Sequence, residues 1–196
     1  MPEQSSKADR WNKRYQASAL NAPPAPCALL SSCGHLIPGR GRALDLACGL
    51  GGNAFFLAEK GLQVDACDIS AEALIRIEDW AGEQSQSIQT IKRDIEQAGL
   101  PQGQWDIIVV SRYLFRPLMP ALAAALKPKG LLFYQTFSAE KRGNSGPSSS
   151  DFLLQDNELL AAFGDLKIRY YREECPLPNA AADAASEVFL VAQKPG

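Results

Sequence analysis

The residues from Arg42 to Gly61, RALDLACGLGGNAFFLAEKG, constrain the fold of this chain more than any other stretch. They read as a short apolar strand, a glycine-rich turn and a helix that a glycine ends. Glycine has no β-carbon, so glycines between a strand and a helix let the backbone approach a ligand closely. The stretch therefore predicts a ligand site at a strand-to-helix turn. Asp45, which precedes the turn, is the residue that distinguishes between the possible ligands.

The composition of the chain sets the class of protein and of partner. Its 196 residues are 46% hydrophobic, which is enough for one good core, and its formal net charge of -2 favours neither nucleic acid nor an anionic membrane as partner. No apolar run approaches the roughly 20 residues that a bilayer demands, and the N-terminus lacks the apolar region of a secretory signal. We therefore expect a cytoplasmic monomer or homodimer that acts on a small molecule.

The cysteines and the histidine give no sign of a metal site. The five cysteines are odd in number and show no CxxC spacing, and His35 is the one histidine. This usage is typical of reduced, buried thiols in a cytoplasmic protein, and a structural zinc site is not expected.

Apolar strand-like runs and helix-like runs alternate along most of the chain, as in an open α/β sheet of parallel strands with right-handed crossovers. The final two strands have no convincing helix between them and are expected to pair antiparallel. A turn is expected at Lys127–Gly130. The expected strands are 42–46, 62–67, 87–93, 106–110, 131–137, 166–172 and 187–193, and the expected helices are 9–16, 27–36, 53–60, 71–80, 118–126 and 151–163.

Three successive strands each end with or near a carboxylate. Asp45, Asp68 and Asp94 are 23 and 26 residues apart, and Ser111, Arg112 and Tyr113 follow the next strand. One aspartate at such a place is weak evidence, because aspartate also caps helices. Ligands of open α/β sheets bind at the carboxyl ends of the strands. The three carboxylates together predict that the ligand site lies at this edge.

Asp45 argues against a dinucleotide as the ligand. In the GxGxxG fingerprint a pyrophosphate lies over the turn, and an acidic residue further on binds the ribose, a role that Asp68 would fit. A carboxylate just ahead of the turn would repel that pyrophosphate in a site of reduced dielectric. The spacing here is AxGxGG, with Ala47 at the first position.

S-adenosylmethionine has the groups that this edge would bind. It carries an ammonium and a sulfonium, a ribose diol and an adenine amine, and it has no phosphate. We expect Asp45 to help fix the loop and to position the cationic end of the ligand. The backbone of 47–51 would approach the methionine part. Asp68 would accept the ribose hydroxyls and Asp94 the adenine amine. Two further residues expected beneath the methionine end are Ser111 and Arg112.

These residues carry a resemblance to a known family. The run Asp45-Leu-Ala-Cys-Gly-Leu-Gly resembles the DxGxGxG motif of class I S-adenosylmethionine-dependent methyltransferases, with alanine at the first glycine. Arg93-Asp94, the strand 106–111 and the turn 126–130 resemble the later motifs. The resemblance covers nearly the whole chain from Arg42 onward. It implies a single-domain Rossmann-like fold, with helices on both faces of a mostly parallel seven-stranded sheet in the order 3-2-1-4-5-7-6 that ends in an antiparallel hairpin.

The resemblance also implies the domain limits and the set of cofactor residues. Residues 1–41 would be a helical segment that covers the cofactor site, and 42–196 the domain that binds S-adenosylmethionine and leaves S-adenosylhomocysteine as product. The face of Trp11 and Tyr15 would cover the cofactor or simply dock the N-terminus, and both readings stay open. The full cofactor set is Trp11, Arg14, Tyr15, Asp45, Ala47, Cys48, Gly49, Gly51, Asn53, Asp68, Ile69, Asp94, Ile95, Ser111 and Arg112.

The acceptor is less well defined. The chain is most similar to the tellurite-resistance-type and thiopurine-type methyltransferases in residues 44–68, in the Trp11–Tyr15 element and in the late Tyr171-Arg-Glu-Glu. This resemblance implies a small nucleophile that is soft (S, Se or Te) or anionic. Arginines could hold an anion by paired hydrogen bonds, and the alternative is a solvated surface role. The expected acceptor residues are Tyr113, Arg116 and Arg142. Glu173 and Glu174 are either bases or solvated strand ends, and the 143–150 loop is either a lid or disordered.

Two other functions remain open at this point. One is an NAD(P)-dependent oxidoreductase, which Asp45 and the C-terminal hairpin disfavour. The other is a non-catalytic module that binds S-adenosylmethionine, because methyl transfer requires alignment and exclusion of water and leaves no catalytic signature in a sequence.

Overall fold

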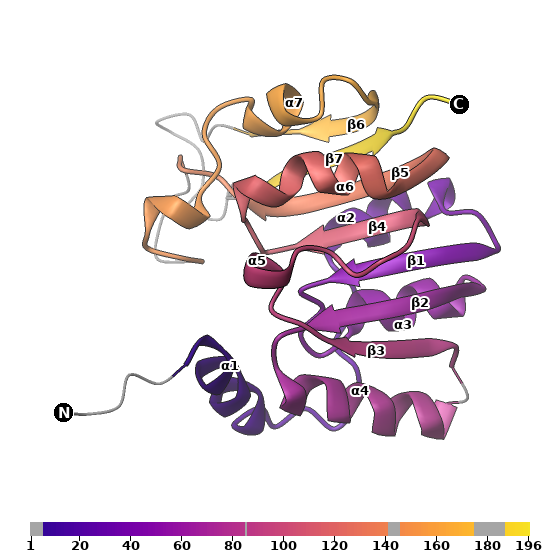
Figure 1. Ribbon diagram of the computed structural model, residues 1–196, viewed down its shortest axis with the longest axis vertical. Helices are drawn as coiled ribbons and strands as arrows, with labels where there is room; N and C mark the ends of the chain where they lie inside the picture. The colour runs from indigo at the N-terminus through magenta and orange to yellow at the C-terminus, as the bar shows by residue number, and fades with distance from the viewer. Residues whose placement is uncertain (1–5, 85, 141–145, 175–186) are drawn as a thin grey trace. The chain divides into compact units, whose positions relative to one another are not determined.

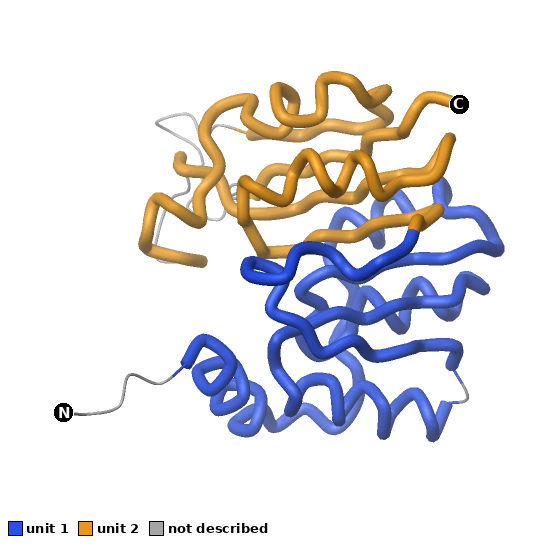
Figure 2. Tube along the Cα trace, viewed as in Figure 1, with its two compact units in different colours: residues 1–103 blue, residues 104–196 orange. Residues whose placement is uncertain are grey.

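The structure of the protein is a computed structural model that describes residues 6–84, 86–140, 146–174 and 187–196. Seven strands form one sheet in the order β3-β2-β1-β4-β5-β7-β6, and the predicted order is therefore confirmed (Figure 1). The chain divides into two compact units, Met1–Gly103 and Gln104–Gly196 (Figure 2). The units are described in turn, and the predicted domain limit at residues 41 and 42 stays a prediction.

Unit 1 contains three parallel strands, β1 (Gly41–Leu46), β2 (Leu62–Asp68) and β3 (Ile88–Lys92). β2 pairs with β1 and with β3, so that Asp45 lies opposite Ala66 and Asp68 lies opposite Lys92. Residues 43–46 of β1 are all buried, as expected for a strand covered on both faces.

The longer helices of unit 1 follow their strands as predicted. α3 (Gly52–Glu59) packs on β1 and β2, and α4 (Ala71–Gln84) packs on β2 and β3. α2 (Ala28–Cys33) continues into the 3-10 helix η1 (Gly34–Leu36), and α5 (Ile95–Ala98) is a short helix that the sequence did not predict. Asp94 begins α5, because its side chain accepts the backbone N–H of Glu96.

Helix α1 (Lys7–Gln16) begins two residues before the expected position. Ser6 and Asp9 form a capping box, in which the Ser6 side chain accepts the Asp9 N–H and the Asp9 carboxylate accepts the Ser6 N–H. Ser6 therefore caps the helix, and Lys7 and Ala8 belong to its first turn. Residues 1–5 lie outside the described residues.

Unit 2 contains β4 (Trp105–Ser111), β5 (Leu126–Phe137), β6 (Lys167–Arg172) and β7 (Glu187–Gln193). β4 and β5 pair parallel, and β7 pairs antiparallel with both β5 and β6, so the predicted hairpin is confirmed. The 3-10 helix η2 (Arg116–Leu118) leads into α6 (Met119–Ala125), which packs on β5.

The predicted turn at Lys127–Gly130 is wrong. These residues are part of β5, which begins at Leu126. Lys129 donates its N–H to the carbonyl of Lys194, and Lys194 donates to Gly130, so the segment pairs with the residue after β7. The strand is irregular here, because Lys129 has a left-handed φ of 65° and the register with β4 shifts. The sequence pattern detected the end of α6 but not this long-range pairing.

The single helix predicted at 151–163 is also wrong. The structure has a 3-10 helix, η3 (Ser150–Phe152), and a short α7 (Glu158–Ala162). Between them, Leu154 donates its N–H to Phe137 and accepts from Ala139, at 2.9 and 2.8 Å. Asn157 has a left-handed backbone with φ 57°. Pairing with the end of β5 therefore interrupts a run whose leucine spacing is helical.

Among the described residues, none of the helices combines the length and the apolar character that crossing a membrane would require.

The turn after β1 has a left-handed backbone at alternate positions. The φ angles of Ala47, Gly49 and Gly51 are 54°, 53° and 78°, and the N–H of Gly51 bonds the carbonyl of Cys48 at 3.0 Å. Glycine adopts such angles freely, whereas a residue with a β-carbon is destabilised by roughly 1–2 kcal/mol. The turn therefore imposes strain on Ala47.

We expect the substitution Ala47→Gly to stabilise the protein by about 1 kcal/mol, because relief of the strained φ exceeds the extra entropy that glycine gives the unfolded chain. Chemical denaturation measures the free energy of unfolding. The matched control Ala54→Gly, inside α3, should destabilise by about 1 kcal/mol. A loss of stability in Ala47→Gly would contradict this description of the turn.

Candidate functional site

Unit 1 brings the three predicted carboxylates to one edge of its sheet. β1, β2 and β3 are parallel, so the ends of these strands, at or near Asp45, Asp68 and Asp94, lie side by side. The glycine turn follows β1 directly, and its residues 48–52 are buried. The carboxylates and the backbone of the turn are therefore available to the same ligand.

Asp45 is fully buried, and one of its two carboxylate oxygens has no hydrogen-bond partner. Oδ1 accepts a hydrogen bond from Asn53 Nδ2 at 3.3 Å. Oδ2 has no hydrogen-bond partner, and among the described residues only one other buried side-chain N or O atom shares this state. Burial raises the pKa of Asp45 from 3.8 to about 7, against the effect of hydrogen bonds from the Asn53 side chain and the Ala54 backbone. A buried acceptor left unpaired is unfavourable, so this oxygen favours a ligand that brings a donor or a positive charge.

Asn53 connects this carboxylate to the N-terminal segment. Its Oδ1 accepts the N–H of Cys27 at 2.9 Å while its amide nitrogen donates to Asp45. The neighbouring Gly52 leaves room for the chain, because a β-carbon there would lie 2.6 Å from the carbonyl oxygen of Pro24. The segment before α2 is thus fixed against the start of α3.

Asp68 fixes the glycine turn from the side of β2. Its Oδ2 accepts the N–H of Gly49 and its Oδ1 accepts the N–H of Ser70, both at 2.9 Å. Burial raises its pKa, and the hydrogen bonds from Ser70, Gly49 and Ile69 oppose that rise. A carboxylate oxygen can accept more than one hydrogen bond, so Asp68 keeps capacity for a diol.

The remaining predicted residues of unit 1 lie close by. Asp94 accepts from α5 through Oδ1, and Ile95, the first residue of α5, is buried. Ile69 is half-buried after β2. Cys48 is buried in the turn, where burial raises the pKa of its thiol well above the ordinary value, and its N–H bonds the carbonyl of Cys67. A buried neutral thiol contributes apolar surface and no charge.

Helix α1 crosses this edge and is held by polar contacts. None of its residues is buried. Lys7 forms an ion pair with Glu96, and Asn12 accepts a hydrogen bond from the Ser70 hydroxyl at 2.7 Å. A β-carbon at Gly49 would lie 2.8 Å from the hydroxyl oxygen of Tyr15, so a larger residue there would displace the Tyr15 side chain in addition to straining φ.

The other two predicted residues of α1 form a stack with Tyr15. The rings of Trp11 and Tyr15 are 5.7 Å apart, and the Arg14 guanidinium lies 5.4 Å from the centre of the Trp11 ring. Trp11 remains 38% exposed. Burial and the charge of Asp68 raise the pKa of Tyr15, as expected for a phenol close to the carboxylates.

In unit 2 the residues after β4 are held by the fold. Arg112 has φ 53°, and its N–H bonds the carbonyl of Gln135 at 2.7 Å. Its Nε forms an ion pair with Glu187 at 2.7 Å, and Gln135 donates to the second oxygen of that carboxylate. Ser111 is half-buried. The prediction that Ser111 and Arg112 contact the methionine end stays a prediction.

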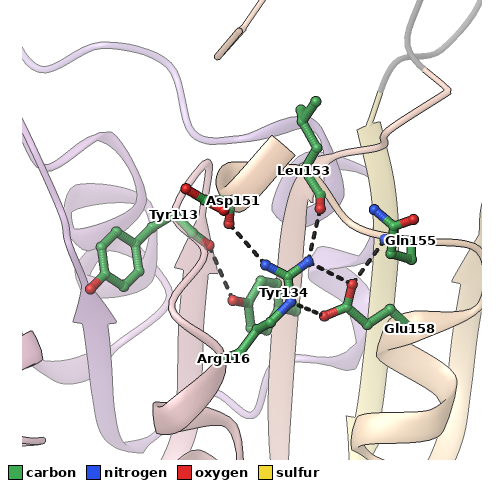
Figure 3. A network of polar contacts seen from close by, with 7 residues as sticks. All are labelled: Tyr113, Arg116, Tyr134, Asp151, Leu153, Gln155 and Glu158. Atoms are coloured by element: carbon green, nitrogen blue, oxygen red, sulfur yellow. Dashed lines mark hydrogen bonds and ion pairs between the residues drawn. The ribbon is translucent and has the colours of Figure 1, made fainter. Parts of the chain in front are cut away.

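Arg116 uses its guanidinium within the fold (Figure 3). Nε and Nη2 bond the two oxygens of Glu158 at 2.6 and 2.9 Å, and Nη1 and Nη2 bond the carbonyls of Asp151 and Leu153 at 2.9 Å. The bonds to Glu158 raise the pKa of Arg116. Burial alone would raise the pKa of Glu158, but its bonds to Arg116 and to the Gln155 backbone hold that pKa below the ordinary value. Arg116 therefore has little capacity left for an acceptor.

The other two predicted acceptor residues differ in what the structure shows. The side chain of Tyr113 points away from the Arg116 network, and its carbonyl accepts from the Tyr134 hydroxyl at 3.1 Å (Figure 3). Arg142 lies outside the described residues. The same holds for residues 143–145 of the 143–150 loop, so neither interpretation of that loop is tested.

Three polar residues that matter at these edges were missed by the sequence analysis. They are Asn12, which docks α1, and Arg172 and Glu187, which end β6 and begin β7 at the same end of the hairpin. The rule that strand ends collect ligand residues could have found Arg172, since it ends β6. No local signal marks Asn12 or Glu187, because their partners are distant in sequence.

Comparisons with known proteins agree with this arrangement. Residues 43–130 match the family described as "Methyltransferase domain". YqeM of Bacillus subtilis, a candidate methyltransferase, is 32% identical over 160 residues, which are 77% of this chain and 57% of YqeM. TehB of Haemophilus influenzae, named as an S-adenosyl-L-methionine-dependent methyltransferase, is 25% identical over 174 residues, which are 85% of this chain and 58% of TehB. The chain thus spans less than two thirds of these relatives.

Solved structures show the same fold. The crystal structure of TehB has a TM-score of 0.70 at 19% identity and covers 96% of this chain and 67% of its own. The crystal structure of the cyclase SpnF has a TM-score of 0.62 at 18% identity and covers 82% of this chain and 76% of its own. Proteins with different named reactions therefore share this fold.

We expect Asp45→Asn to raise the free energy of unfolding at pH 8 by about 1–3 kcal/mol, because the ionised carboxylate is buried without a full set of partners. The raised pKa means that the native state binds the proton more tightly than the unfolded state. The wild type should therefore lose stability as the pH rises from about 4 to about 7. Denaturation at several pH values measures this slope, which the variant should lack. The exposed control Asp79→Asn should keep it, and an unchanged slope in Asp45→Asn would contradict the assignment.

We expect Arg116→Lys to lower the free energy of unfolding by about 1–3 kcal/mol, because lysine cannot reproduce the bonds to Glu158 and to two carbonyls, a loss that partial exposure reduces. Thermal and urea denaturation measure the change. Arg169→Lys, on exposed β6, should change stability by less than about 0.5 kcal/mol. A fully stable Arg116→Lys protein with weakened acceptor binding would instead support the direct role in acceptor binding.

Proposed function

We propose that this chain is an S-adenosylmethionine-dependent methyltransferase that transfers a methyl group to a small acceptor, because residues 43–130 match a methyltransferase domain and YqeM is 32% identical to it. The proposal combines the similarity to methyltransferases with the chemistry of the residues at the carboxyl ends of the strands in unit 1. S-adenosylmethionine, when bound, supplies a methyl group on a sulfonium that leaves as a neutral thioether.

The unpaired carboxylate oxygen of Asp45 is the observation that carries the proposal. It is buried, adjacent to the turn and without a hydrogen bond. A cation that approaches the turn would remove the unfavourable state of this oxygen, and the methionine ammonium is such a cation. The same carboxylate would oppose a phosphate at the turn, which disfavours the NAD(P)-dependent alternative.

The other residues of the edge have complementary tasks in this proposal. The backbone of 47–51 lines the methionine part, and Asp68 holds the ribose diol while it keeps the Gly49 N–H in place. Asp94 accepts the adenine amine through the oxygen that does not cap α5. Tyr15 and the rest of α1 cover the edge and exclude water from it.

Methyl transfer requires alignment of the two reactants and exclusion of water more than it requires acid–base groups. Holding the acceptor in line with the methyl–sulfur bond can supply roughly 7–11 kcal/mol of the acceleration. The fixed turn, the Asn53 bridge and the cover provided by α1 serve that purpose. A general base is needed only for an acceptor that arrives protonated, and Glu173 and Glu174 remain candidates for it.

The proposal for the methyl acceptor has weaker support than the proposal for the cofactor. The similarity to TehB and the resemblance to tellurite-resistance-type methyltransferases favour a small, soft or anionic nucleophile. Neither favours nucleic acid as the acceptor. A cytoplasmic location and a monomer or homodimer stay predictions from the sequence.

A non-catalytic module that binds S-adenosylmethionine is the second candidate function. It stays open because methyl transfer leaves no catalytic signature in a sequence, and the likeness to the cyclase SpnF adds that this fold is not restricted to methyl transfer. Turnover must therefore be measured as well as binding.

Titration with S-adenosylhomocysteine and with NADH by calorimetry tests the proposed cofactor. At pH 8, where Asp45 is ionised, we expect S-adenosylhomocysteine to bind and NADH to show no binding, because the Asp45 carboxylate repels a pyrophosphate. Tight binding of NADH alone would overturn the proposal. Release of S-adenosylhomocysteine from S-adenosylmethionine in the presence of thiols, selenite, tellurite or small acids then separates an enzyme from a module.

The substitution Asp68→Asn should weaken binding of S-adenosylhomocysteine by about 1.5–3 kcal/mol, the scale of hydrogen bonds to a charged group. Thermal unfolding of the same protein checks that the turn is intact. The exposed control Asp79→Asn should bind as the wild type does. Equal affinity in Asp68→Asn would mean that the ribose lies elsewhere.

A further inference from the structure

The side chain of Asn53, at the start of α3, is bonded at both ends of its amide within unit 1. Its Oδ1 accepts the backbone N–H of Cys27 at 2.9 Å, and its Nδ2 donates to Asp45 Oδ1 at 3.3 Å. The residue is only 8% exposed. Asn53 is therefore fixed between the segment before α2 and the buried carboxylate at the end of β1.

The N–H of Cys27 decides which way this amide points. A peptide N–H can only donate a hydrogen bond and an ionised carboxylate can only accept one. The amide must therefore present its oxygen to Cys27 and its nitrogen to Asp45. If the amide turned over, two donors would meet at one end and two acceptors at the other, and both hydrogen bonds would be lost. The bond from Cys27 thus keeps the Asn53 N–H directed at Asp45.

The bond from Asn53 determines which oxygen of Asp45 is left for a ligand. Asn53 contacts Oδ1, and Oδ2 is buried without a hydrogen-bond partner. The same bond favours the ionised carboxylate, against the burial that raises the pKa of Asp45 to about 7. A carboxylate that is held in one orientation and kept charged is prepared to bind a cation.

We propose that Asn53 is a positioning residue for the cofactor, which acts through Asp45 by keeping Oδ2 directed at the ammonium of the methionine part. The N–H of Cys27 sets the direction of its amide. This inference rests on the proposed function and deepens it, because it makes the segment before α2 part of the cofactor site through hydrogen bonds alone. The segment need not touch the ligand to affect its binding.

Two ligands test whether Asn53 acts through Asp45: S-adenosylhomocysteine, and 5′-methylthioadenosine, which lacks the ammonium. At pH 8 we expect Asn53→Ala to weaken S-adenosylhomocysteine by about three- to tenfold and to leave 5′-methylthioadenosine unchanged. In a protein that already carries Asp45→Asn, the substitution Asn53→Ala should cause little further loss, because the charge on which it acts is gone. A purely structural role in α3 would weaken both ligands in either background.

The substitution Cys27→Pro tests the role of the segment before α2, because proline removes the N–H that orients the amide. Cys27 has φ −62° and ψ 155°, a backbone conformation that proline also adopts. Cys27→Ala keeps the N–H and is the reference for loss of the thiol. Relative to Cys27→Ala, we expect Cys27→Pro to weaken S-adenosylhomocysteine by about three- to tenfold and to leave 5′-methylthioadenosine unchanged.

Few groups other than Asp45 can change charge at this place near neutral pH. Residues 17–34 and 46–58 contain no charged residue. Burial raises the pKa of the Tyr15 phenol and of the Cys48 and Cys67 thiols, so these groups are neutral near pH 7. Asp68 is the other carboxylate that acts on Asp45, and burial raises its pKa too. In the proposed site Asp68 holds the ribose, which both ligands carry, so its effect cancels in the ratio of their affinities.

The pH dependence of that ratio therefore reports on Asp45. In the wild type the ratio should turn in favour of S-adenosylhomocysteine as the pH rises through about 7, where Asp45 ionises. In Asn53→Ala the same change should occur at a higher pH, because loss of the bond from Asn53 makes the charged carboxylate less favourable. In Asp45→Asn the ratio should not depend on pH.

The inference is overturned by equal losses for both ligands in Asn53→Ala, by no loss for either, or by an unmoved pH profile. Equal affinities in Cys27→Pro and Cys27→Ala would overturn it as well. Thermal unfolding checks that each variant is folded, and the Cys27 pair carries the test if Asn53→Ala does not fold. Failure of the proposed function would appear differently, as absence of S-adenosylhomocysteine binding in the wild type itself.

Discussion

The buried carboxylate of Asp45 is the group on which the arrangement of unit 1 depends. One oxygen holds Asn53, and Asn53 in turn holds the backbone at Cys27, so a single side chain ties β1, α3 and the N-terminal segment together. The other oxygen is left for a ligand. Burial makes the charged form unfavourable in the free protein, and a bound cation would reverse that effect. The buried, unpaired carboxylate is unfavourable in the free protein, and for that reason the site selects a positively charged ligand.

The glycine turn shows why its sequence cannot vary freely. Gly49 has a left-handed φ and lies against the Tyr15 hydroxyl, so a β-carbon there would strain the backbone and displace Tyr15. Asp68 then fixes the same residue through its N–H. Ala47 adopts a left-handed φ with a side chain, and it marks the place where the chain departs from the usual motif at a cost in strain.

The arginines of unit 2 illustrate how differently similar residues contact the fold. Arg116 is surrounded by acceptors from a segment that α7 and η3 bring near, and its role is to hold that segment. Arg172 is stacked but poorly paired. Charge and position near a strand end are the same for both, so only the contacts distinguish them.

The sequence was sufficient to predict the strands, their parallel arrangement and the sheet edge at which the carboxylates gather, because apolar runs and turn residues are local signals. Two local patterns were overridden. The leucines of 151–163 have helical spacing, but Leu154 pairs with the end of β5, and Lys127–Gly130 has turn composition, but Lys129 pairs with Lys194. The partner of Arg116 is 42 residues away. Contacts of that kind are set by tertiary packing and have no signature in the neighbouring residues.

The most direct test compares two ligands at pH 8, where Asp45 is ionised: S-adenosylhomocysteine, and 5′-methylthioadenosine, which lacks the ammonium and carboxylate. If Asp45 recognises the cationic end, Asp45→Asn should weaken S-adenosylhomocysteine by about tenfold or more and leave 5′-methylthioadenosine unchanged. Equal losses for both ligands, or no loss for either, would contradict the account, because the carboxylate would then serve only the fold.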